Sequence, residues 1–222
     1  MIGIISDIHA NYVALAAVMN ALDDLGVSTT ICLGDIAGYH DQINECCDEL
    51  RSREIFSLMG NHDWYLTSGN VCSRSNSVNR CIEYQRGVIQ ASNLSWLASL
   101  SSSATIHGLN IVHGGWHDQF EEYMTPSAEY FADIHGSAFA SGHTHEQLLW
   151  SNDSTQYCNP GSVGQPRDGD PRSAFATWDG QRFTLHRVEY DITATQQSMA
   201  LAGFDPYYSQ NLSFGLRLGA PP

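Results

Sequence analysis

Short apolar runs alternate with amphipathic segments along the first third of the chain. The first run, Ile2–Ser6, precedes Asn11–Gly26, where apolar residues recur at helical spacing and a glycine closes the segment. The second run, Thr29–Leu33, precedes a predicted helix over Gln42–Arg51, and the third run covers Ile55–Met59. This alternation of buried strands and helices predicts an α/β fold.

The rest of the chain has helices first and closely spaced strands later. The Ser- and Asn-rich stretch Leu66–Asn79 is expected to be a plain connection, with a lid over a site as the alternative, and the tail beyond Gly203 is expected to be weakly structured. The expected helices are Ser77–Ala91, Asn93–Leu100, a segment from Thr125 to about Ile134, and Ile192–Ala202. The expected strands are Thr105–His107, Asn110–His113, Ser137–Ser141, Gln147–Trp150, Gln156–Cys158, Ala174–Trp178 and Arg182–Val188, the last two joined by an Asp179-Gly180 turn.

Length and charge narrow the range of functions. The 222 residues fit one domain of ordinary size, so a single domain over residues 1–222 is expected. The formal charge is −14, and all 10 basic residues are arginines, which excludes Schiff-base lysine chemistry and a P-loop. Such acidity opposes binding to nucleic acid or anionic lipid, because both need matching cations. Phosphate binding is still possible where metal ions supply the positive charge.

The six cysteines indicate a reducing compartment. None is spaced as CxxC and several lie in apolar context, so buried, reduced thiols and a cytoplasmic location are expected. The N-terminal run enters Asp7 without the basic and long apolar regions of a signal peptide, and no stretch has membrane-spanning length. We therefore expect no membrane partner.

Polar side chains that can bind metals follow five of the predicted strands directly. Asp7 and His9 are two residues apart, and in extended chain such a pair points to the same side. The same spacing recurs at His143 and His145. Since open α/β sheets bind ligands at the carboxyl ends of their strands, these residues are expected to converge. The candidate ligands are Asp7, His9, Asp35, Asn61, His113, His143 and His145.

This mixture of imidazole, carboxylate and amide oxygen suits divalent ions such as Mn, Fe, Co or Zn. Seven ligands are too many for one tetrahedral site, so two ions bridged by Asp35 are expected. Taken singly, each motif has a plainer interpretation: Gly60-Asn61-His62-Asp63 as a polar turn, or Asp7 as a helix cap beside a stray histidine. HExxH, GxGxxG and GxSxG motifs are absent. The other histidines are expected to be surface or packing residues, except His40 and His117, which lie just beyond Asp35 and His113.

Five sequence blocks together resemble the calcineurin-like metallophosphoesterase superfamily. They are Asp7-x-His9, Gly34-Asp35-x-x-Gly38, Gly60-Asn61-His62-Asp63, His113-Gly114 and Gly142-His143-x-His145. The stretch Asn159–Arg172 further resembles the small bacterial single-domain branch of that superfamily. The resemblance implies a four-layer β-sandwich, with two mixed sheets flanked by helices, whereas the chain pattern alone also allows an open parallel sheet.

The resemblance also implies roles for individual residues. One ion would be held by Asp7, His9 and His145, and the second by Asn61, His113 and His143, with Asp35 bridging. His62 matches the catalytic histidine and Asp63 its partner. Two positions depart from the family pattern: Gly38, where many relatives have a second Asp, and Gly115–Asp118, where an arginine is often present. The ions would be Mn, Fe, Zn, Co or Ni, with Mn or Fe favoured.

Two ions about 3.5–4 Å apart would lower the pKa of a bridging water. The resulting hydroxide would attack phosphorus, and His62 would act as general acid on the leaving oxygen. Arg167 and His117 are the candidate substrate-binding residues, although Arg167 could also be an ordinary surface arginine. The expected substrate is a small phosphomonoester or phosphodiester of nucleotide type, such as a dinucleoside polyphosphate. The alternatives are an RNA or DNA phosphodiesterase and a non-catalytic protein-binding scaffold. Metal identity, substrate and oligomeric state stay open.

Overall fold

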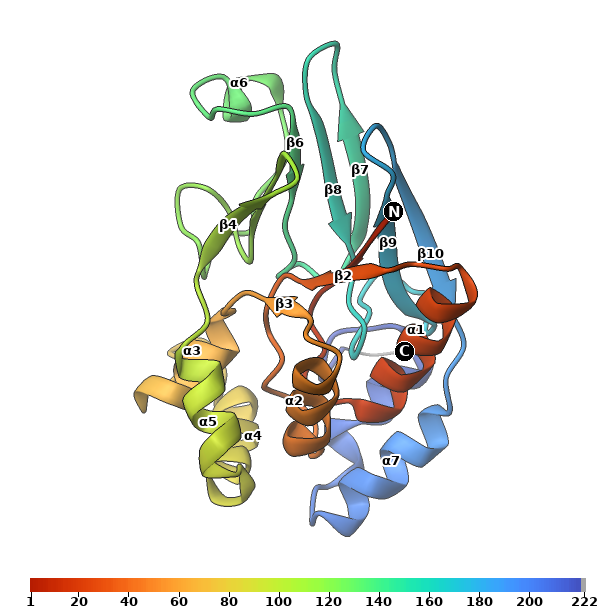
Figure 1. The fold of residues 1–222 in the computed structure, drawn as a ribbon. Helices are drawn as coiled ribbons and strands as arrows, with labels where there is room; N and C mark the ends of the chain where they lie inside the picture. Colours follow the sequence, from red (N-terminus) through yellow and green to blue (C-terminus); the bar gives the residue numbers. More distant parts are fainter. Residues whose placement is uncertain (221–222) are drawn as a thin grey trace.

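The computed structural model, which describes residues 1–220, contains two five-stranded mixed sheets. They lie in the upper part of Figure 1, and the helices other than α6 lie below them. The strand order is β10-β9-β1-β2-β3 in the first sheet and β4-β5-β6-β8-β7 in the second. The first sheet comprises β1 (Ile2–Ile5), β2 (Thr29–Cys32), β3 (Phe56–Ser57), β9 (Ser173–Trp178) and β10 (Phe183–Val188). The second comprises β4 (Ser103–Ile106), β5 (Leu109–Val112), β6 (Ala138–Ala140), β7 (Gln147–Ser151) and β8 (Gln156–Pro160).

The parallel pairs of both sheets direct their carboxyl ends to one region. In the first sheet β1, β2 and β3 are parallel, with Ile4 opposite Ile31, while β9 is antiparallel to both of its neighbours, β1 and β10. In the second sheet β5, β6 and β8 are parallel, and β4 and β7 are antiparallel edge strands. The loops after β1, β2, β3, β5 and β6 therefore gather where the two sheets meet.

A hydrophobic core joins the two sheets. Ile4 and Ile31 of the first sheet are buried in one cluster with Ile111 and Ala140 of the second. Fully burying an isoleucine side chain contributes about 1.5–3 kcal/mol. This interface holds the two sheets together, and the expectation of two mixed sheets flanked by helices is confirmed.

Helices cover the outer face of the first sheet. The largest hydrophobic cluster contains Leu15 and Val18 of α1 and Cys46 and Leu50 of α2, packed with strand residues such as Ile5. The helices are α1 (Tyr12–Asp24), α2 (Ile43–Ser52), α3 (Asn61–Ser68), α4 (Asn76–Val88), α5 (Ala91–Ala98), α6 (Ala128–Phe131) and α7 (Ile192–Leu201). On the second sheet, α6 and its neighbours pack on the outer face, where Phe131 meets Phe139 and Tyr157. Within the described residues, none of these helices combines the length and apolar character required to cross a bilayer.

Three local predictions were wrong. Helix α3 begins at Asn61 itself, because the carboxylate of Asp63 caps its first turn. Helix α6 ends at Phe131, three residues before the predicted end, and the chain continues in tight turns. The tail beyond Gly203 forms two 3-10 turns (Pro206–Tyr208 and Gln210–Phe214) whose anchors Phe204 and Leu212 are buried.

Candidate metal centre

The loops at the carboxyl ends of β1, β2, β3, β5 and β6 bring the seven candidate ligands together, and all seven are almost fully buried. The extended geometry that we expected for Asp7-x-His9 and His143-x-His145 was wrong. Their backbone is left-handed, a strained conformation for residues with side chains that is retained where the surrounding fold imposes it. The φ angles are 55° at Asp7, 51° at His9, 55° at Asp35, 67° at His143 and 64° at His145.

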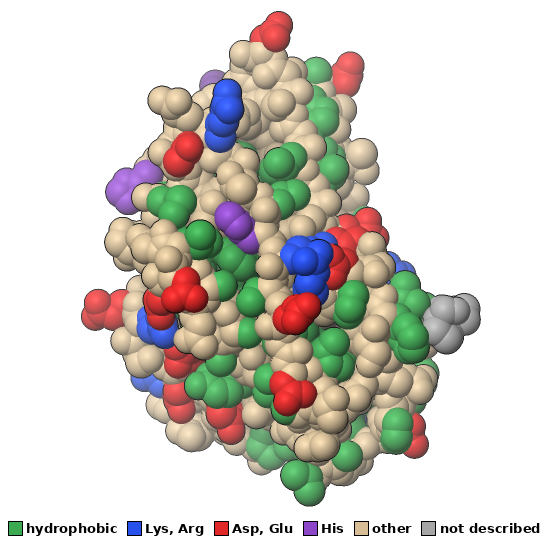
Figure 2. All heavy atoms as spheres, turned by 90° about the vertical axis from the view of Figure 1, so that its right-hand side faces the viewer, with side chains coloured by type: hydrophobic (Ala, Val, Ile, Leu, Met, Phe, Trp, Pro, Cys, Tyr) green, Lys and Arg blue, Asp and Glu red, His purple; other side chains and the backbone are tan. Residues whose placement is uncertain are grey.

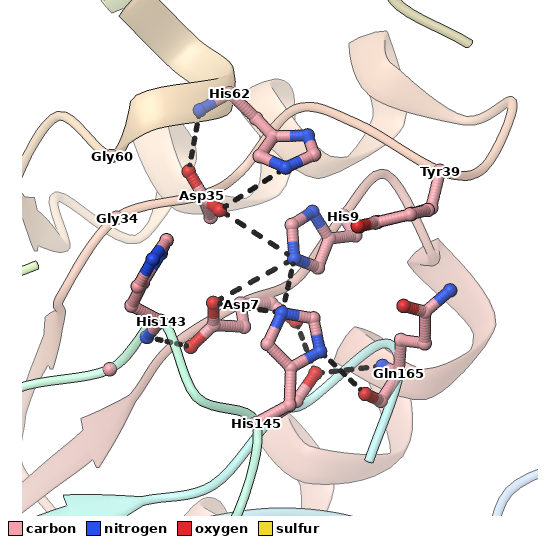
Figure 3. A network of polar contacts seen from close by, with 12 residues as sticks. Asp7, His9, Gly34, Asp35, Tyr39, Gly60, His62, His143, His145 and Gln165 are labelled. Atoms are coloured by element: carbon pink, nitrogen blue, oxygen red, sulfur yellow. Dashed lines mark hydrogen bonds and ion pairs between the residues drawn. The ribbon is translucent and has the colours of Figure 1, made fainter. Parts of the chain in front are cut away.

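Asp7, His9 and His145 form the first cluster. Nε2 of His9 lies 3.0 Å from Nε2 of His145, and Oδ1 of Asp7 lies 3.7 Å and 3.3 Å from these two nitrogens. Three donor atoms of metal-ligand type therefore face one point (Figure 3).

Backbone carbonyls orient three of the histidines. Nδ1 of His9 lies 2.8 Å from the carbonyl oxygen of Ala37, and Nδ1 of His145 lies 2.6 Å from that of Gln165. His113 makes the same contact with Leu33 at 3.0 Å. A carbonyl can only accept, so each Nδ1 carries a proton and each Nε2 faces the site.

Asp35, Asn61, His113 and His143 form the second cluster. Nε2 of His113 lies 3.3 Å from Oδ2 of Asp35 and 3.2 Å from Oδ1 of Asn61. The amide of Asn61 is oriented by Glu121, whose carboxylate accepts from its Nδ2 at 3.4 Å. The oxygen of Asn61 is thereby left for the site. Glu121 was not among the sequence candidates, because it belongs to no strand-end motif.

Asp35 lies between the two clusters. Its Oδ2 is 3.3 Å from Nε2 of His113 and 3.7 Å from Nε2 of His9, which belong to different clusters. Its Oδ1 accepts the backbone N–H of His62 at 2.8 Å, at the start of α3 (Figure 3). This position suits a carboxylate shared by two ions.

The ionisation of these groups fits a cation. Burial opposes charge on Asp7, but the neighbouring His145 and His9 hold the pKa of that carboxyl well below its usual range. Burial lowers the pKa of His143 to about 3 and that of His145 to about 4, so both rings are neutral. Burial also disfavours charge on His113, yet Asp35 raises its pKa to about 9, so an ion must displace a proton there.

Two buried polar atoms support the fit to divalent ions directly. Oδ1 of Asp7 and Nε2 of His143 have no hydrogen-bond partner among the described residues. An uncompensated buried polar group is costly, and a buried carboxylate most of all. Ions in the two clusters would satisfy both atoms.

His62 and Asp63 follow Asn61 on α3. We expected these two side chains to contact each other, but they do not. The carboxylate of Asp63 accepts the backbone N–H groups of Gly60 at 2.9 Å and Ala37 at 2.8 Å, while Nδ1 of His62 has no partner among the described residues. Asp63 therefore caps the helix rather than orienting the ring. Nε2 of His62 lies 3.9 Å from Oδ2 of Asp35. Burial lowers the pKa of His62 well below its usual value, so the ring is neutral.

A cavity of about 500 Å³ opens onto both clusters. Asp35, Asn61, His62, His143 and His145 form its floor, and Arg167 lines it as well. His117 does not line it: this side chain is exposed and its ring lies against Tyr130. His40 is buried beside the site, where its Nδ1 bonds the carbonyl oxygen of His9. No sequence pattern indicated several other lining residues, among them Arg74, Tyr123, Tyr207 and Arg217.

Known proteins resemble this chain over most of its length. Residues 1–181 match the family model of the calcineurin-like phosphoesterase superfamily domain. An uncharacterized protein of Methanocaldococcus jannaschii is 31% identical over 240 residues, covering 97% of this chain and 98% of that protein. The crystal structure of a metallophosphoesterase from Sphaerobacter thermophilus is 35% identical, with a TM-score of 0.84 over 97% of this chain and 98% of that one. A hypothetical protein from Pyrococcus horikoshii OT3 shares the fold at 16% identity, with a TM-score of 0.87 over 97% and 99% of the two chains.

Proposed function

Since this chain belongs to the calcineurin-like phosphoesterase superfamily and is a phosphoric ester hydrolase, we propose that it cleaves a small nucleotide-type phosphomonoester or phosphodiester. The observation that carries this proposal is the pair of buried ligand clusters, with Asp35 between them, that open into one cavity. A cytoplasmic location is part of the proposal, supported by six buried, unpaired thiols.

Two divalent ions fit the donor atoms. Asp7, His9 and His145 would hold one, Asn61, His113 and His143 the other, and Asp35 both. The mixed nitrogen and oxygen donors suit Mn or Fe best, with Zn, Co or Ni as alternatives. Bound there, such ions would supply positive charge for the phosphoryl oxygens and a water that ionises near neutral pH.

The chain's own residues would bind the substrate and assist the leaving group. His62 faces the cavity from the start of α3, and its neutral ring carries one N–H that can donate to the leaving oxygen. Arg167 lies 5.4 Å above the ring of Tyr39 and donates to its hydroxyl at 2.9 Å, which holds the guanidinium at the cavity. A planar guanidinium suits a phosphate group, because it can donate two parallel hydrogen bonds.

Size and charge favour a compact substrate over a nucleic acid. A cavity of about 500 Å³ can enclose a nucleotide-sized ligand. The protein carries a net charge of −14, and on the face seen in Figure 2 the basic side chains lie scattered among acidic and uncharged ones. Duplex and single-stranded nucleic acids need a continuous basic surface. A dinucleoside polyphosphate fits the proposal, and a protein-binding scaffold is disfavoured because no candidate ligand is replaced.

An activity screen tests the proposal. The metal-reconstituted protein is assayed on mononucleotides, cyclic nucleotides, dinucleoside polyphosphates and short RNA, with Asp35→Ala as the matched control. We expect hydrolysis of at least one small ester, and none by the control. Activity confined to RNA would support the nuclease alternative, and complete inactivity with both ions bound would support the scaffold.

A further inference from the structure

The C-terminal segment 207–218 lies outside the region that matches the family model. It nevertheless lines the cavity that opens onto the two clusters. Tyr207, Arg217 and Leu218 all line that cavity, together with Asp35 and His143. A second, distant segment, Cys72–Val78, lines it too. The cavity is therefore larger than the phosphoryl site alone, and its outer part consists of residues unrelated to ion binding.

The segment is fixed against the body of the protein. The carbonyl oxygen of Gly215 accepts the backbone N–H of Gly169 at 3.0 Å, and a Cβ atom at Gly215 would lie 2.6 Å from the backbone of Asp170. Asn211 donates to the carbonyl oxygen of Leu216 at 2.9 Å, and Leu218 packs against the main hydrophobic core. Arg217 lies between these two anchored leucines, so its backbone position is determined.

Arg74 is held at the cavity in a comparable way. The backbone N–H and carbonyl of Cys72 bond the side chain of Asn79 at 2.7 Å and 2.8 Å, which fixes the loop. The guanidinium of Arg74 pairs with Glu121 and lies 5.5 Å from the centre of the Tyr123 ring. Tyr123 in turn lies 4.3 Å from the ring of His143, so this arginine and tyrosine stand next to the second cluster.

Three of the ten arginines thus line one cavity in a protein of charge −14. Nε of Arg167 is buried and has no partner among the described residues, and Arg217 forms no ion pair within them. Two ions would already offset the charge of one phosphoryl group. Arg74 is paired with Glu121, whereas Arg167 and Arg217 form no ion pair within the described residues. Together with the half-exposed rings of Tyr123 and Tyr207, these groups exceed what a single phosphate ester needs.

We propose that Arg217, with Arg74, binds a second anionic group of the substrate, so that the preferred substrate carries further phosphates beyond the one that is cleaved. Tyr123 and Tyr207 offer exposed rings on which a nucleobase can stack. This inference rests on the proposed function and adds to it the residues that would select a nucleoside or dinucleoside polyphosphate.

The test compares two substrates in the metal-loaded protein. Bis(p-nitrophenyl) phosphate has one phosphate, and diadenosine tetraphosphate has three beyond the one attacked. Arg217→Gln should lower kcat/KM on the tetraphosphate about 10- to 100-fold, the usual loss of a charge-assisted contact, and mainly through KM. On bis(p-nitrophenyl) phosphate the change should be less than about twofold. Arg217→Lys should recover part of the loss, because it keeps the charge.

Arg80→Gln is the matched control, since Arg80 is an exposed arginine that does not line this cavity. Equal effects of Arg217→Gln on both substrates, or no effect on either, would overturn the inference while the hydrolase proposal stands. A calorimetric titration with a methylene-bridged, non-hydrolysable tetraphosphate analogue gives a readout independent of turnover. Binding that weakens in Arg217→Gln but not in Arg80→Gln supports the inference. Undetectable binding to the wild-type protein, or binding that is unchanged in Arg217→Gln, overturns it, even if neither ester is hydrolysed.

Discussion

A Cβ atom built on Gly38 would lie 2.2 Å from Nδ1 of His62, well inside contact distance. The backbone at Gly38 also has a φ of +100°, which residues with side chains rarely adopt. The ring of His62 therefore occupies space that exists only because residue 38 has no side chain. The position of the His62 ring in this protein therefore depends on a glycine at position 38, where many relatives have an Asp.

Gly38→Ala should displace the imidazole of His62, 2.2 Å from the added Cβ, more than that of the ion ligand His9, whose Nδ1 would lie 2.9 Å from it. We expect activity to fall by about 10²-fold or more, because the group that assists the leaving oxygen is moved, whereas ion content stays at two per chain. Metal analysis by mass spectrometry and steady-state kinetics on the same preparation check this. Loss of ions together with activity would mean that Gly38 supports the ligand clusters instead.

His62→Asn should separate leaving-group assistance from ion binding. Acid catalysis is worth ~10²–10⁴-fold, and only where the leaving oxygen needs a proton. We expect a loss of that size on nucleotide esters and a much smaller one on a nitrophenyl phosphodiester, whose phenolate leaves unaided. An equal loss on both substrates at constant ion content would contradict the role in leaving-group assistance and point to charge stabilisation.

Asp63→Asn should act through the helix and not through the ring of His62. The carboxylate accepts two backbone N–H groups, and the amide can satisfy only one of them. Losing a helix cap costs ~1 kcal/mol and a buried unsatisfied donor ~1–3 kcal/mol. We expect a lower melting temperature, with weaker ion binding through displaced Asn61. Unchanged thermal stability with lost activity would contradict this.

Asp35→Ala should remove the carboxylate that lies between the two clusters. The purified wild-type protein is expected to bind about two divalent ions per chain, and the variant at most one, with activity abolished. Circular dichroism controls for the fold. An active variant, or a wild type with a single tight site, would rule out the shared carboxylate.

Removal of the ions should loosen the contact between the sheets. Asp7, His9, Asp35 and Asn61 follow strands of the first sheet, whereas His113, His143 and His145 follow strands of the second. An ion at 100 times its Kd stabilises by about 2.7 kcal/mol, so two should raise the melting temperature by roughly 10–20 °C. Calorimetry with chelator, and again after Mn²⁺ is restored, measures this. An unchanged melting temperature would mean that the ions do not bind the folded protein in preference to the unfolded chain.

The positions of the candidate ligands could be predicted from sequence because polar residues directly after apolar strands have one plausible place in an α/β fold. The seven residues do lie together at the strand ends. The local geometry could not be predicted, since the left-handed backbone at Asp7 and His143 is imposed by distant contacts. The backbone N–H of His143, for example, donates to Oδ2 of Asp7 at 3.0 Å.

The residues that the sequence failed to indicate have no motif around them. Arg217 lies in the tail beyond Gly203, which we expected to be weakly structured. Its place at the cavity depends on Leu218 reaching the core and on Gly215 fitting against Asp170, contacts between segments about 45 residues apart or more. Helix α3 was not predicted because its capping residue, Asp63, also fits a role in the chemistry of the site.

The strand order has a consequence for the synthesis of the chain. The central strand of the first sheet, Ile2–Ile5, pairs on one side with Thr29–Cys32 but on the other with Ser173–Trp178. A ribosome must therefore make about four fifths of the chain before this strand can complete its pairing, and contacts of such long range are slow to form. The histidines at 143 and 145 also emerge late. The nascent protein should thus acquire its ions only near the end of translation, and the arginine at 217 should close the cavity last.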